Sequence, residues 1–314
     1  MKETVLAVDL GGTKLLIGEV DSDGKILNSK KYPSGFLDQK QAVKLLCDSI
    51  EDYRKEVGFT GQKPVKMGVG LIGQISPKTG MWMMIDPGRK APTPIAQLLR
   101  EKFQLECFID NDVKAATLAE QKFGAGKDID DFVYLNIGTG IAAGFVSNQQ
   151  LIRGWQNDAG EIGHSTVDYN SNIPCICGRF GCVEAIASGS GMDKRVRQLM
   201  ERYPASSLCK DAEKGFVSAE RIFEAACNKD VLAMRVAMDA ADAAAELILN
   251  IVYIFNPKRI ILGGGVGGSE WMNTELSKRL KLPCMAEVEG GVITSLLNPN
   301  TAGLIGAATI ALNE

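Results

Sequence analysis

Histidine is nearly absent from this chain of 314 residues, and long apolar runs and a strong charge of either sign are missing. A total of 35 Lys and Arg against 38 Asp and Glu gives a net charge of -3. This balance argues against a general nucleic-acid-binding surface, which needs a clustered positive field. The longest apolar-rich segment, residues 240–255, contains two acidic residues and is too short to span a bilayer. Small anionic ligands remain compatible with the composition, because backbone amides can hold them.

The sequence also lacks a signal-peptide pattern, since the first four residues lead directly into the strand-like run VLAVDLGG. Eight cysteines without such a signal indicate free thiols in a reducing compartment, and we expect a cytoplasmic protein. Five cysteines are scattered along the chain and are interpreted as packing residues, namely Cys47, Cys107, Cys209, Cys227 and Cys284. The other three are clustered beside the chain's single histidine.

The order of apolar segments and turns predicts an α/β protein with two lobes and a ligand cleft between them. Residues 4–33 are predicted to form three strands joined by a glycine turn and by an Asp23-Gly24 turn. Helices are predicted over 37–58, 93–104 and 111–126, with buried strands over 65–73 and 107–110 and a Gly/Pro-rich loop up to residue 94. The last third is predicted to contain a helix over roughly 240–255, a strand ending in glycines and a closing helix over 302–312.

A second segment repeats the pattern of the N-terminus. Residues 132–154, FVYLNIGTGIAAGFVSNQQLIRG, again read as strand, glycine turn, strand, polar turn and strand. The turn Gly138-Thr139-Gly140 corresponds to Gly11-Gly12-Thr13. Such self-similarity predicts two related halves of one architecture.

Three glycine turns follow apolar strands, in DLGGTK, NIGTGIAAG and ILGGGVGG. Glycine lets a backbone approach a phosphate closely, although each turn alone is better explained as a plain tight turn. None has the P-loop or dinucleotide-binding spacing. Three such turns together favour a nucleotide held between lobes. Asp9 is then a candidate for Mg²⁺, Thr13 and Thr139 for phosphate oxygens, and Lys14 faces either phosphate or solvent.

Asn111-Asp112 lies where a predicted strand ends and a helix begins. That position favours ligand contact in α/β proteins. Two interpretations stay open from the sequence. In the first, Asp110, Asn111 or Asp112 is a plain helix N-cap. In the second, a carboxylate here accepts a hydroxyl proton as phosphate is transferred.

The segment from His164 to Cys182 carries a metal-ligand pattern. Cys175, Cys177 and Cys182 are spaced C-x-C-x4-C, and His164 precedes Cys175 by eleven residues. Three thiolates and one imidazole form a complete tetrahedral shell for zinc, which leaves no open position and predicts a structural ion. The alternatives are free thiols beside an unrelated histidine, or a disulfide between Cys175 and Cys177. The compartment and the short separation argue against the disulfide.

Taken together, the motifs DLGGTK, DNDVKAA, IGTGIAAGF, AGEIGH, CICGRFGCVE and ILGGGV resemble the ROK family of sugar kinases and repressors, within the actin/hexokinase-like superfamily. The resemblance covers nearly the whole chain. It implies a two-lobed actin-like ATPase fold, which is a duplicated ribonuclease H-like fold. It further implies a small lobe of residues 1–117, completed by the C-terminal helix at about 300–314, and a large lobe of 118–299 with the zinc site and a dimer surface.

The resemblance also implies roles for individual residues. Asp112 would be the general base, and the other sugar-binding residues would be Asn111, Glu161, His164 and Glu184. His164 would use one ring nitrogen for zinc and the other for the sugar. The ATP phosphates and Mg²⁺ would be bound by Asp9, Gly11, Gly12, Thr13, Lys14, Gly138, Thr139 and Gly140. The adenosine would lie against Gly263, Gly264 and Gly265.

The implied activity is ATP-dependent phosphorylation of a hexose at its primary 6-hydroxyl. Glucose is the first choice, N-acetylmannosamine or N-acetylglucosamine the next, and fructose less favoured. The chain departs from the family pattern at Ala142 and Ala143, where relatives have glycine, and at Ile72, where sugar kinases often have proline. We expect sugar and ATP as partners, neither nucleic acid nor membrane, and a homodimer or a dimer of dimers.

Two rival functions come from other classes. Sugar-responsive repressors of the family carry an N-terminal DNA-binding domain, and only eight residues precede Asp9 here, so we expect no such domain. An actin-like structural ATPase is disfavoured by the Cys-His cluster and by the acids implied to face a sugar.

Overall fold

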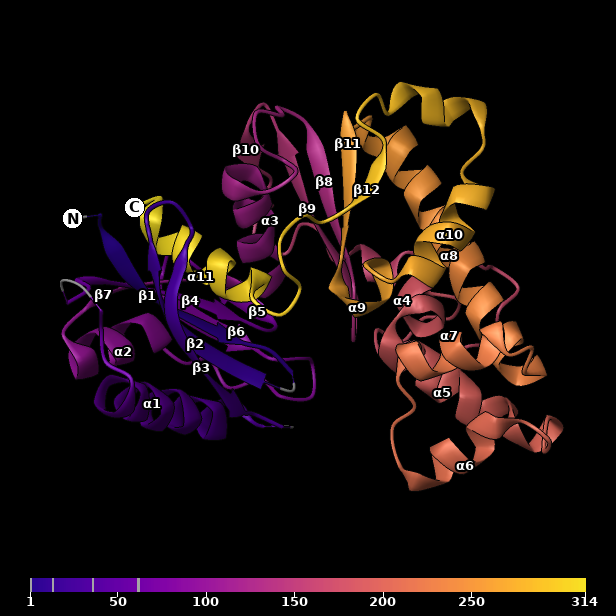
Figure 1. Cartoon of the computed structure of the whole chain (residues 1–314), viewed down its shortest axis with the longest axis horizontal. Coiled ribbons are helices and arrows are strands. Elements are labelled where there is room, and N and C mark those ends of the chain that lie inside the picture. Colours follow the sequence, from indigo (N-terminus) through magenta and orange to yellow (C-terminus); the bar gives the residue numbers. More distant parts are fainter. Residues whose placement is uncertain (1, 13, 36, 61–62) are drawn as a thin grey trace. The chain divides into compact units, whose positions relative to one another are not determined.

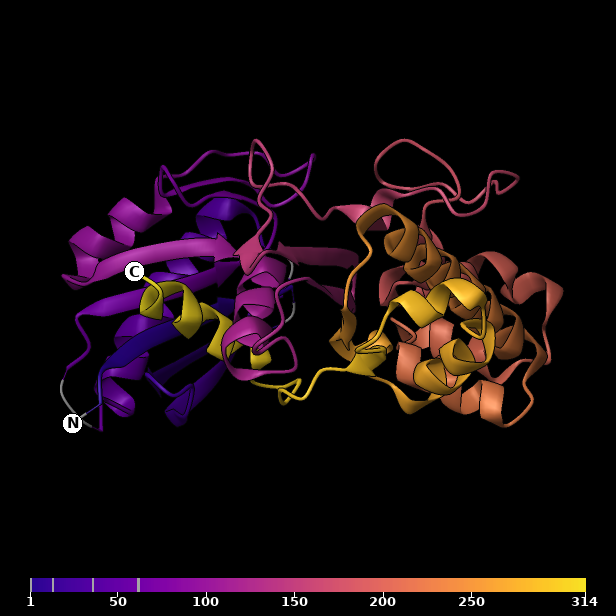
Figure 2. The same cartoon turned by 90° about the horizontal axis from the view of Figure 1, so that it is seen from above.

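The computed structural model describes residues 2–12, 14–35, 37–60 and 63–314, shown in Figures 1 and 2. The chain divides into two compact units. Unit 1 comprises Met1–Asp128, Gln149–Ala159 and Leu296–Glu314, and unit 2 comprises Ile129–Asn148 and Gly160–Ser295. Among the described residues, no helix has both the length and the apolar character needed to cross a membrane.

These units differ from the predicted lobes in their bounds. The predicted boundary after residue 117 falls inside helix α3 (Asp112–Phe123), which packs along helix α11 (Ala302–Leu312) within unit 1. A helix is a cooperative element, so a compact unit ends after it and not within it. Unit 1 also includes the short segment 149–159, which the family resemblance placed in the large lobe.

The sheet of unit 1 has the strand order β3-β2-β1-β4-β7. The first three strands are antiparallel neighbours, and β4 and β7 continue the sheet in parallel with β1. The strands are β1 (Thr4–Leu10), β2 (Lys14–Asp21), β3 (Ile26–Pro33), β4 (Lys66–Leu71) and β7 (Glu106–Asn111). The predicted turn between β2 and β3 is confirmed: the N–H of Gly24 donates to the carbonyl of Asp21 at 2.9 Å, and Gly24 has a φ of 78°.

Helices cover both faces of this sheet (Figures 1 and 2). Successive side chains of a strand point to opposite faces. Leu6, Val8 and Leu10 therefore pack with α1 (Gln39–Glu56) and α2 (Ile95–Phe103), while Val5 and Ala7 pack with α11. The N-terminus of α1 is fixed by a capping box between Asp38 and Gln41, as its sequence position allows.

A small hairpin replaces part of the predicted Gly/Pro-rich loop. Strand β5 (Gln74–Ser76) pairs with β6 (Met81–Met84), and Trp82 of β6 is completely buried. The indole N–H of Trp82 donates to the carbonyl of Ile72 at 3.0 Å. Burial of this large ring, and not local strand propensity, explains why the segment is ordered.

The sheet of unit 2 repeats the arrangement of unit 1. Strand β8 pairs antiparallel with β9 and parallel with β11, which in turn pairs parallel with β12. The strands are β8 (Phe132–Ile137), β9 (Ile141–Ser147), β11 (Arg259–Gly263) and β12 (Val292–Thr294), and the polar turn after β9 leads to β10 (Gln150–Leu151). The predicted duplication is therefore confirmed at the level of strand order.

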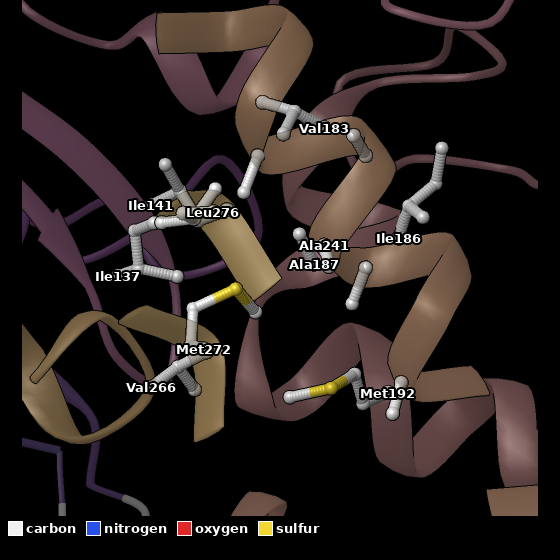
Figure 3. Close-up of a cluster of buried hydrophobic side chains, with 14 of the residues drawn as sticks. Ile137, Ile141, Val183, Ile186, Ala187, Met192, Ala241, Val266, Met272 and Leu276 are labelled. Carbon is white, nitrogen blue, oxygen red and sulfur yellow. The ribbon is translucent and has the colours of Figure 1, made fainter. Parts of the chain in front are cut away.

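Helices supply most of the core of unit 2, where side chains from several of them meet (Figure 3). Met192 and Met272 point into the same interior, beside the small side chains of Ala187 and Ala241. The helices are α4 (Val183–Ala187), α5 (Gly189–Leu199), α6 (Ser207–Lys214), α7 (Ala219–Cys227), α8 (Val231–Phe255), α9 (Gly264–Gly267) and α10 (Glu270–Arg279), with one-turn helices η1 (Ile162–His164), η2 (Met200–Arg202) and η3 (Pro283–Glu287).

Helix α8 is longer than predicted. It begins at Val231, nine residues before the Ala-rich stretch at 240–255 that indicated it. The side chain of Asp230 accepts from the N–H of Ala233 at 3.1 Å and caps the helix. An Asp before an apolar run is a start signal that could have been recognised from the sequence.

Candidate functional site

Asp9 is the last member of the β1 row that faces α11. Its side chain is buried, and burial raises the pKa of its carboxyl to about 6, although the charge of Lys14 opposes the shift. Gly303, in the first turn of α11, lies against this carboxyl so closely that a Cβ there would overlap Asp9 Oδ2. An acid held in this way gains strongly from a cation, which fits the predicted Mg²⁺ position.

We expect Asp9→Asn to stabilise the fold at neutral pH. Folded Asp9 titrates near pH 6 and an unfolded Asp near 3.8. The native state therefore binds the proton more strongly, and stability falls as pH rises from about 4 to 6. Above pH 6 the full cost of the buried charge is about 3 kcal/mol, because each tenfold change in proton affinity corresponds to about 1.4 kcal/mol. Urea unfolding without divalent cations should show that Asp9→Asn is more stable than the parent at pH 8. At pH 5 this difference in the free energy of unfolding should be smaller. An equal difference at both pH values would contradict the burial argument.

The first glycine turn follows Asp9. The N–H of Gly11 donates to the carbonyl of Lys14 at 2.9 Å, and a Cβ added to Gly12 would meet nothing within 4 Å. Lys14 Nζ donates to the carbonyl of Asn300 at 3.2 Å, so the side chain turns toward the segment before α11. Thr13 lies outside the described residues.

Asn111 and Asp112 stand at the junction of β7 and α3, as predicted. Asn111 Oδ1 accepts from the N–H groups of Val113 at 3.0 Å and Lys114 at 3.2 Å, so Asn111 is the N-cap. Asn111 Nδ2 donates to the carbonyl of Gly73 at 3.1 Å. Asp112 is half-buried, and its Oδ1 accepts from the N–H of Val113 at 2.9 Å. The N-cap alternative thus applies to Asn111 and leaves a proton-accepting role to Asp112.

A charged network that sequence reasoning missed surrounds this junction. Asp110 is buried, and its Oδ2 pairs with Arg153 Nη1 at 2.6 Å. Asn157 Nδ2 donates to Asp110 Oδ1 at 2.9 Å, while Lys114 Nζ donates to the carbonyl of Ala159 at 3.0 Å. These contacts tie segment 149–159 to the end of β7. No local pattern signals them, because the partners lie more than 40 residues apart.

In unit 2, the second and third glycine turns lie together. A Cβ on Gly138 would lie 3.8 Å from Gly264 Cα, and Gly264 itself has a φ of 77° that favours glycine. The N–H of Gly189, at the start of α5, donates to the carbonyl of Gly138 at 2.8 Å. A Cβ on Gly265 would meet nothing within 4 Å, whereas one on Gly263 would overlap the ring of Tyr134. Open backbone at Gly265 suits a close ligand approach.

Glu184 stabilises the second glycine turn by a hydrogen bond. Its Oε2 accepts from the N–H of Ile141 at 2.9 Å, and a Cβ on Gly140 would lie 2.8 Å from the same oxygen. Gly140 must therefore remain small for Glu184 to approach. The predicted sugar contact of Glu184 stays a prediction, since this carboxylate already bonds the turn that contains Thr139.

The AGEIGH motif packs on β9 through its two glycines. Gly160 has a φ of 107°, and its carbonyl accepts from the N–H of Ala143 at 2.8 Å. A Cβ on Gly160 or Gly163 would overlap a carbonyl oxygen of β9. This close packing places Glu161 and His164 at the two ends of η1, within unit 2.

The three clustered cysteines and His164 meet, as predicted. Their ligand atoms all lie within 4.8 Å of one another. Cys175 Sγ is 3.4 Å from His164 Nδ1, and Cys177 Sγ is 3.6 Å from Cys182 Sγ. A tetrahedral zinc ion with bonds of about 2.3 Å requires edges of roughly 3.8 Å between sulfur atoms. The donor set and its spacing therefore fit zinc, and Cys175, Cys177 and Cys182 are all free thiols in this structure.

Thiol acidity differs within the cluster. Burial raises the pKa of the Cys177 thiol, but hydrogen bonds from the backbone and side chain of Arg179 outweigh it and lower the pKa to about 6. Burial raises the pKa of Cys175 and that of Cys182, the latter to about 12. The guanidinium of Arg179 also donates to the carbonyl of His164. The Cys177 thiol therefore loses its proton easily, whereas Cys175 and Cys182 would lose theirs on binding a cation. This combination suits a metal centre.

The predicted site residues thus fall into two sets. Unit 1 holds Asp9, Gly11, Gly12, Lys14, Asn111 and Asp112, and unit 2 holds the second and third glycine turns, Glu161, Glu184 and the Cys-His cluster. The duplicated sheet accounts for part of this division, since the first glycine turn follows β1 in unit 1 and the second follows β8 in unit 2.

Comparison with known proteins finds sugar kinases that are similar to this chain in sequence. A glucokinase from Thermotoga maritima is 31% identical over 320 residues, covering 98% of this chain and 97% of that protein. An N-acetylmannosamine kinase from Escherichia coli is 29% identical over 318 residues, covering 99% of each.

In structure, the chain is similar to a ROK family glucokinase from Streptomyces griseus, solved in complex with glucose and AMPPNP. The TM-score is 0.80 at 28% identity, with 99% of this chain and 100% of that chain covered. The predicted fold class, the two-lobed actin-like ATPase fold, is confirmed by such neighbours. The sequence model of the ROK family matches residues 5–314, and the chain therefore belongs to the ROK family.

Proposed function

We propose that this protein is an ATP-dependent hexose kinase that phosphorylates the primary 6-hydroxyl of its sugar, with glucose as the first choice. The observation that carries the proposal is the β7–α3 junction. There Asn111 is held at both ends of its amide, and the half-buried Asp112 follows at the first position of the helix. Similarity to the glucokinases of Thermotoga maritima and Streptomyces griseus supports the same reaction.

In the proposed reaction, Asp112 acts as the general base. The hydroxyl proton of the sugar passes to the carboxylate of Asp112, and the hydroxyl oxygen forms a bond to the γ-phosphorus of ATP. The bond from that phosphorus to the β–γ bridging oxygen breaks, and ADP leaves. The N–H of Val113 donates to Asp112 Oδ1 at 2.9 Å, which fixes the direction of the carboxyl group. Positioning of the hydroxyl supplies much of the rate in such transfers.

The other proposed contacts follow from the two sets of residues. The sugar would be bound by Asn111, Glu161, His164 and Glu184, and the ATP phosphates by the glycine turns. Asp9 would hold Mg²⁺, directly or through water, and the bound ion would offset phosphate charge. The adenosine would lie against Gly263, Gly264 and Gly265, of which Gly265 has open space around it.

His164 would link the zinc site to the sugar. Its Nδ1 faces the cysteine sulfur atoms, at 3.4 Å from Cys175 Sγ, so a zinc ion would take this nitrogen. The other ring nitrogen, Nε2, would then carry the proton and donate to a sugar hydroxyl. The zinc ion would have a structural role, since its four protein ligands complete the shell.

The second candidate is an N-acetylmannosamine or N-acetylglucosamine kinase. The similarity to an N-acetylmannosamine kinase extends over 99% of both chains and favours this alternative specifically. The same base and zinc site would serve either sugar, so the two functions differ only in the pocket around the second carbon.

A substrate panel separates these functions. ADP release should be measured with ATP and Mg²⁺ over glucose, mannose, fructose, N-acetylglucosamine and N-acetylmannosamine. We expect the highest kcat/KM for glucose. A higher value for an N-acetylhexosamine would select the second candidate, and ADP release that no sugar stimulates would reject both.

A further inference from the structure

A cavity in unit 2 is lined by residues that have no role assigned above. Its volume is about 480 Å³, and it is bounded by α5, η2 and α8. Its lining includes three arginines, Arg195 on α5, Arg202 on η2 and Arg235 on α8. Guanidinium groups gathered around one cavity are the usual means of recognising phosphate, because their donors match its oxygens in pairs.

The positive charge of this cavity is only partly neutralised. Asp239 Oδ2 accepts from Arg195 Nη2 at 2.8 Å and from Arg235 Nε at 3.0 Å. Two guanidinium groups thus share one carboxylate oxygen. Within the described parts of the chain, Arg202 has neither an ion-pair nor a hydrogen-bond partner. Three cations against one paired carboxylate leave a surplus of two positive charges.

Arg195 also has an unused donor. Its side chain is only 12% exposed, and its Nε is buried without a hydrogen-bond partner among the described residues. A buried donor without an acceptor costs free energy. An anion in the cavity would draw the guanidinium toward itself and offset part of this cost.

The rest of the lining is polar and neutral, apart from the aliphatic Leu199. Asn172, Gln198 and Tyr203 contribute amide and phenol groups, which can donate to and accept from hydroxyls. We propose that this cavity binds a small phosphomonoester whose organic part carries hydroxyl groups. Such an ester has a charge close to -2 at neutral pH, which equals the surplus of the three arginines and Asp239.

A bound ester would also contact the metal-binding segment. Asn172 lies three residues before Cys175, in the loop that leads to the Cys-His cluster. The binding site itself does not depend on the proposed kinase reaction, because none of its lining residues takes part in that reaction.

Isothermal titration calorimetry with inorganic phosphate and with glucose 6-phosphate tests the proposal. The wild-type protein should bind one ester per chain, more tightly than inorganic phosphate, with an affinity that falls as NaCl is raised. The double variant Arg202→Ala/Arg235→Ala should bind the ester at least about tenfold more weakly, since each charge-assisted hydrogen bond contributes strongly. Lys210→Ala, which removes one positive charge outside the cavity, should bind like wild type.

Three outcomes would overturn the assignment. The first is ester binding that the double variant retains, which would place the ester elsewhere. The second is no binding at millimolar ester, and the third is equal affinity for inorganic phosphate and for the ester. The single variant Arg202→Ala is the control in case the double variant fails to fold. It should fold normally, because this exposed side chain has no partner to lose among the described residues. It should still weaken ester binding while ATP and glucose turnover stays unchanged. Loss of turnover in Asp112 variants with ester binding intact would separate this proposal from the proposed function.

Discussion

Asp112→Asn should lower kcat for sugar phosphorylation by about 10²- to 10⁴-fold, the usual contribution of a general base. The amide oxygen can still accept from the N–H of Val113, so the start of α3 should remain intact. An amide cannot take up the hydroxyl proton, and the loss therefore appears in kcat more than in the KM for sugar or ATP. Steady-state kinetics, together with the melting temperature and the zinc content, measure the effect.

Asp48→Asn is the matched control for this variant. Asp48 is an exposed helical acid whose ion pair with Lys44 is a surface contact between α1 residues. We expect unchanged kinetics for it, because surface ion pairs contribute little. Wild-type kcat in Asp112→Asn would remove Asp112 from the mechanism, and a matching loss in Asp48→Asn would point to a general effect of charge.

Cys182→Ser should abolish zinc binding and strongly destabilise unit 2. Cys182 is completely buried at the start of α4, and hydroxyl oxygen is a poor replacement for a thiolate ligand. We expect zinc to fall from about one ion per chain to near zero, as for a closed structural site. The melting temperature should fall by roughly 10 °C or more if the site contributes about 4 kcal/mol. Elemental analysis and thermal unfolding check both effects.

Cys227→Ser provides the comparison, because Cys227 is an exposed free thiol at the end of α7. It should keep both the zinc content and the melting temperature. A Cys182→Ser protein with full zinc would show that the ion is held elsewhere. A wild-type protein that is metal-free and fully active would reject the zinc site altogether.

Local features of the site could be predicted from the sequence because they depend on neighbours along the chain. Asn111 follows a strand and precedes a helical pattern. The sequence alone therefore indicated both an N-cap at this junction and the position of Asp112 at the start of the helix. The Cys-His cluster was available for a similar reason, since its four ligands lie within 19 residues, from His164 to Cys182.

Other features could not be predicted because they arise from contacts between distant segments. Gly303 reads as one of several small residues in an apolar helix, and only the folded structure shows that it makes room for Asp9. Lys114 reads as an exposed helical lysine, yet it is buried and bonds the carbonyl of Ala159. The strand order was predicted only as a repeated pattern, whereas pairing and register needed the structure.

The packing of α11 on β1 bears on how the protein is made. One face of β1, with Val5 and Ala7, is covered by Leu304, Ala307 and Ala308 from the far end of the chain. A ribosome synthesises α11 long after β1, so this face of the strand stays uncovered while the residues between the two elements emerge. Contacts between residues so far apart in sequence also slow folding. The nascent chain therefore presents an apolar sheet face during synthesis, which is the kind of surface that chaperones recognise.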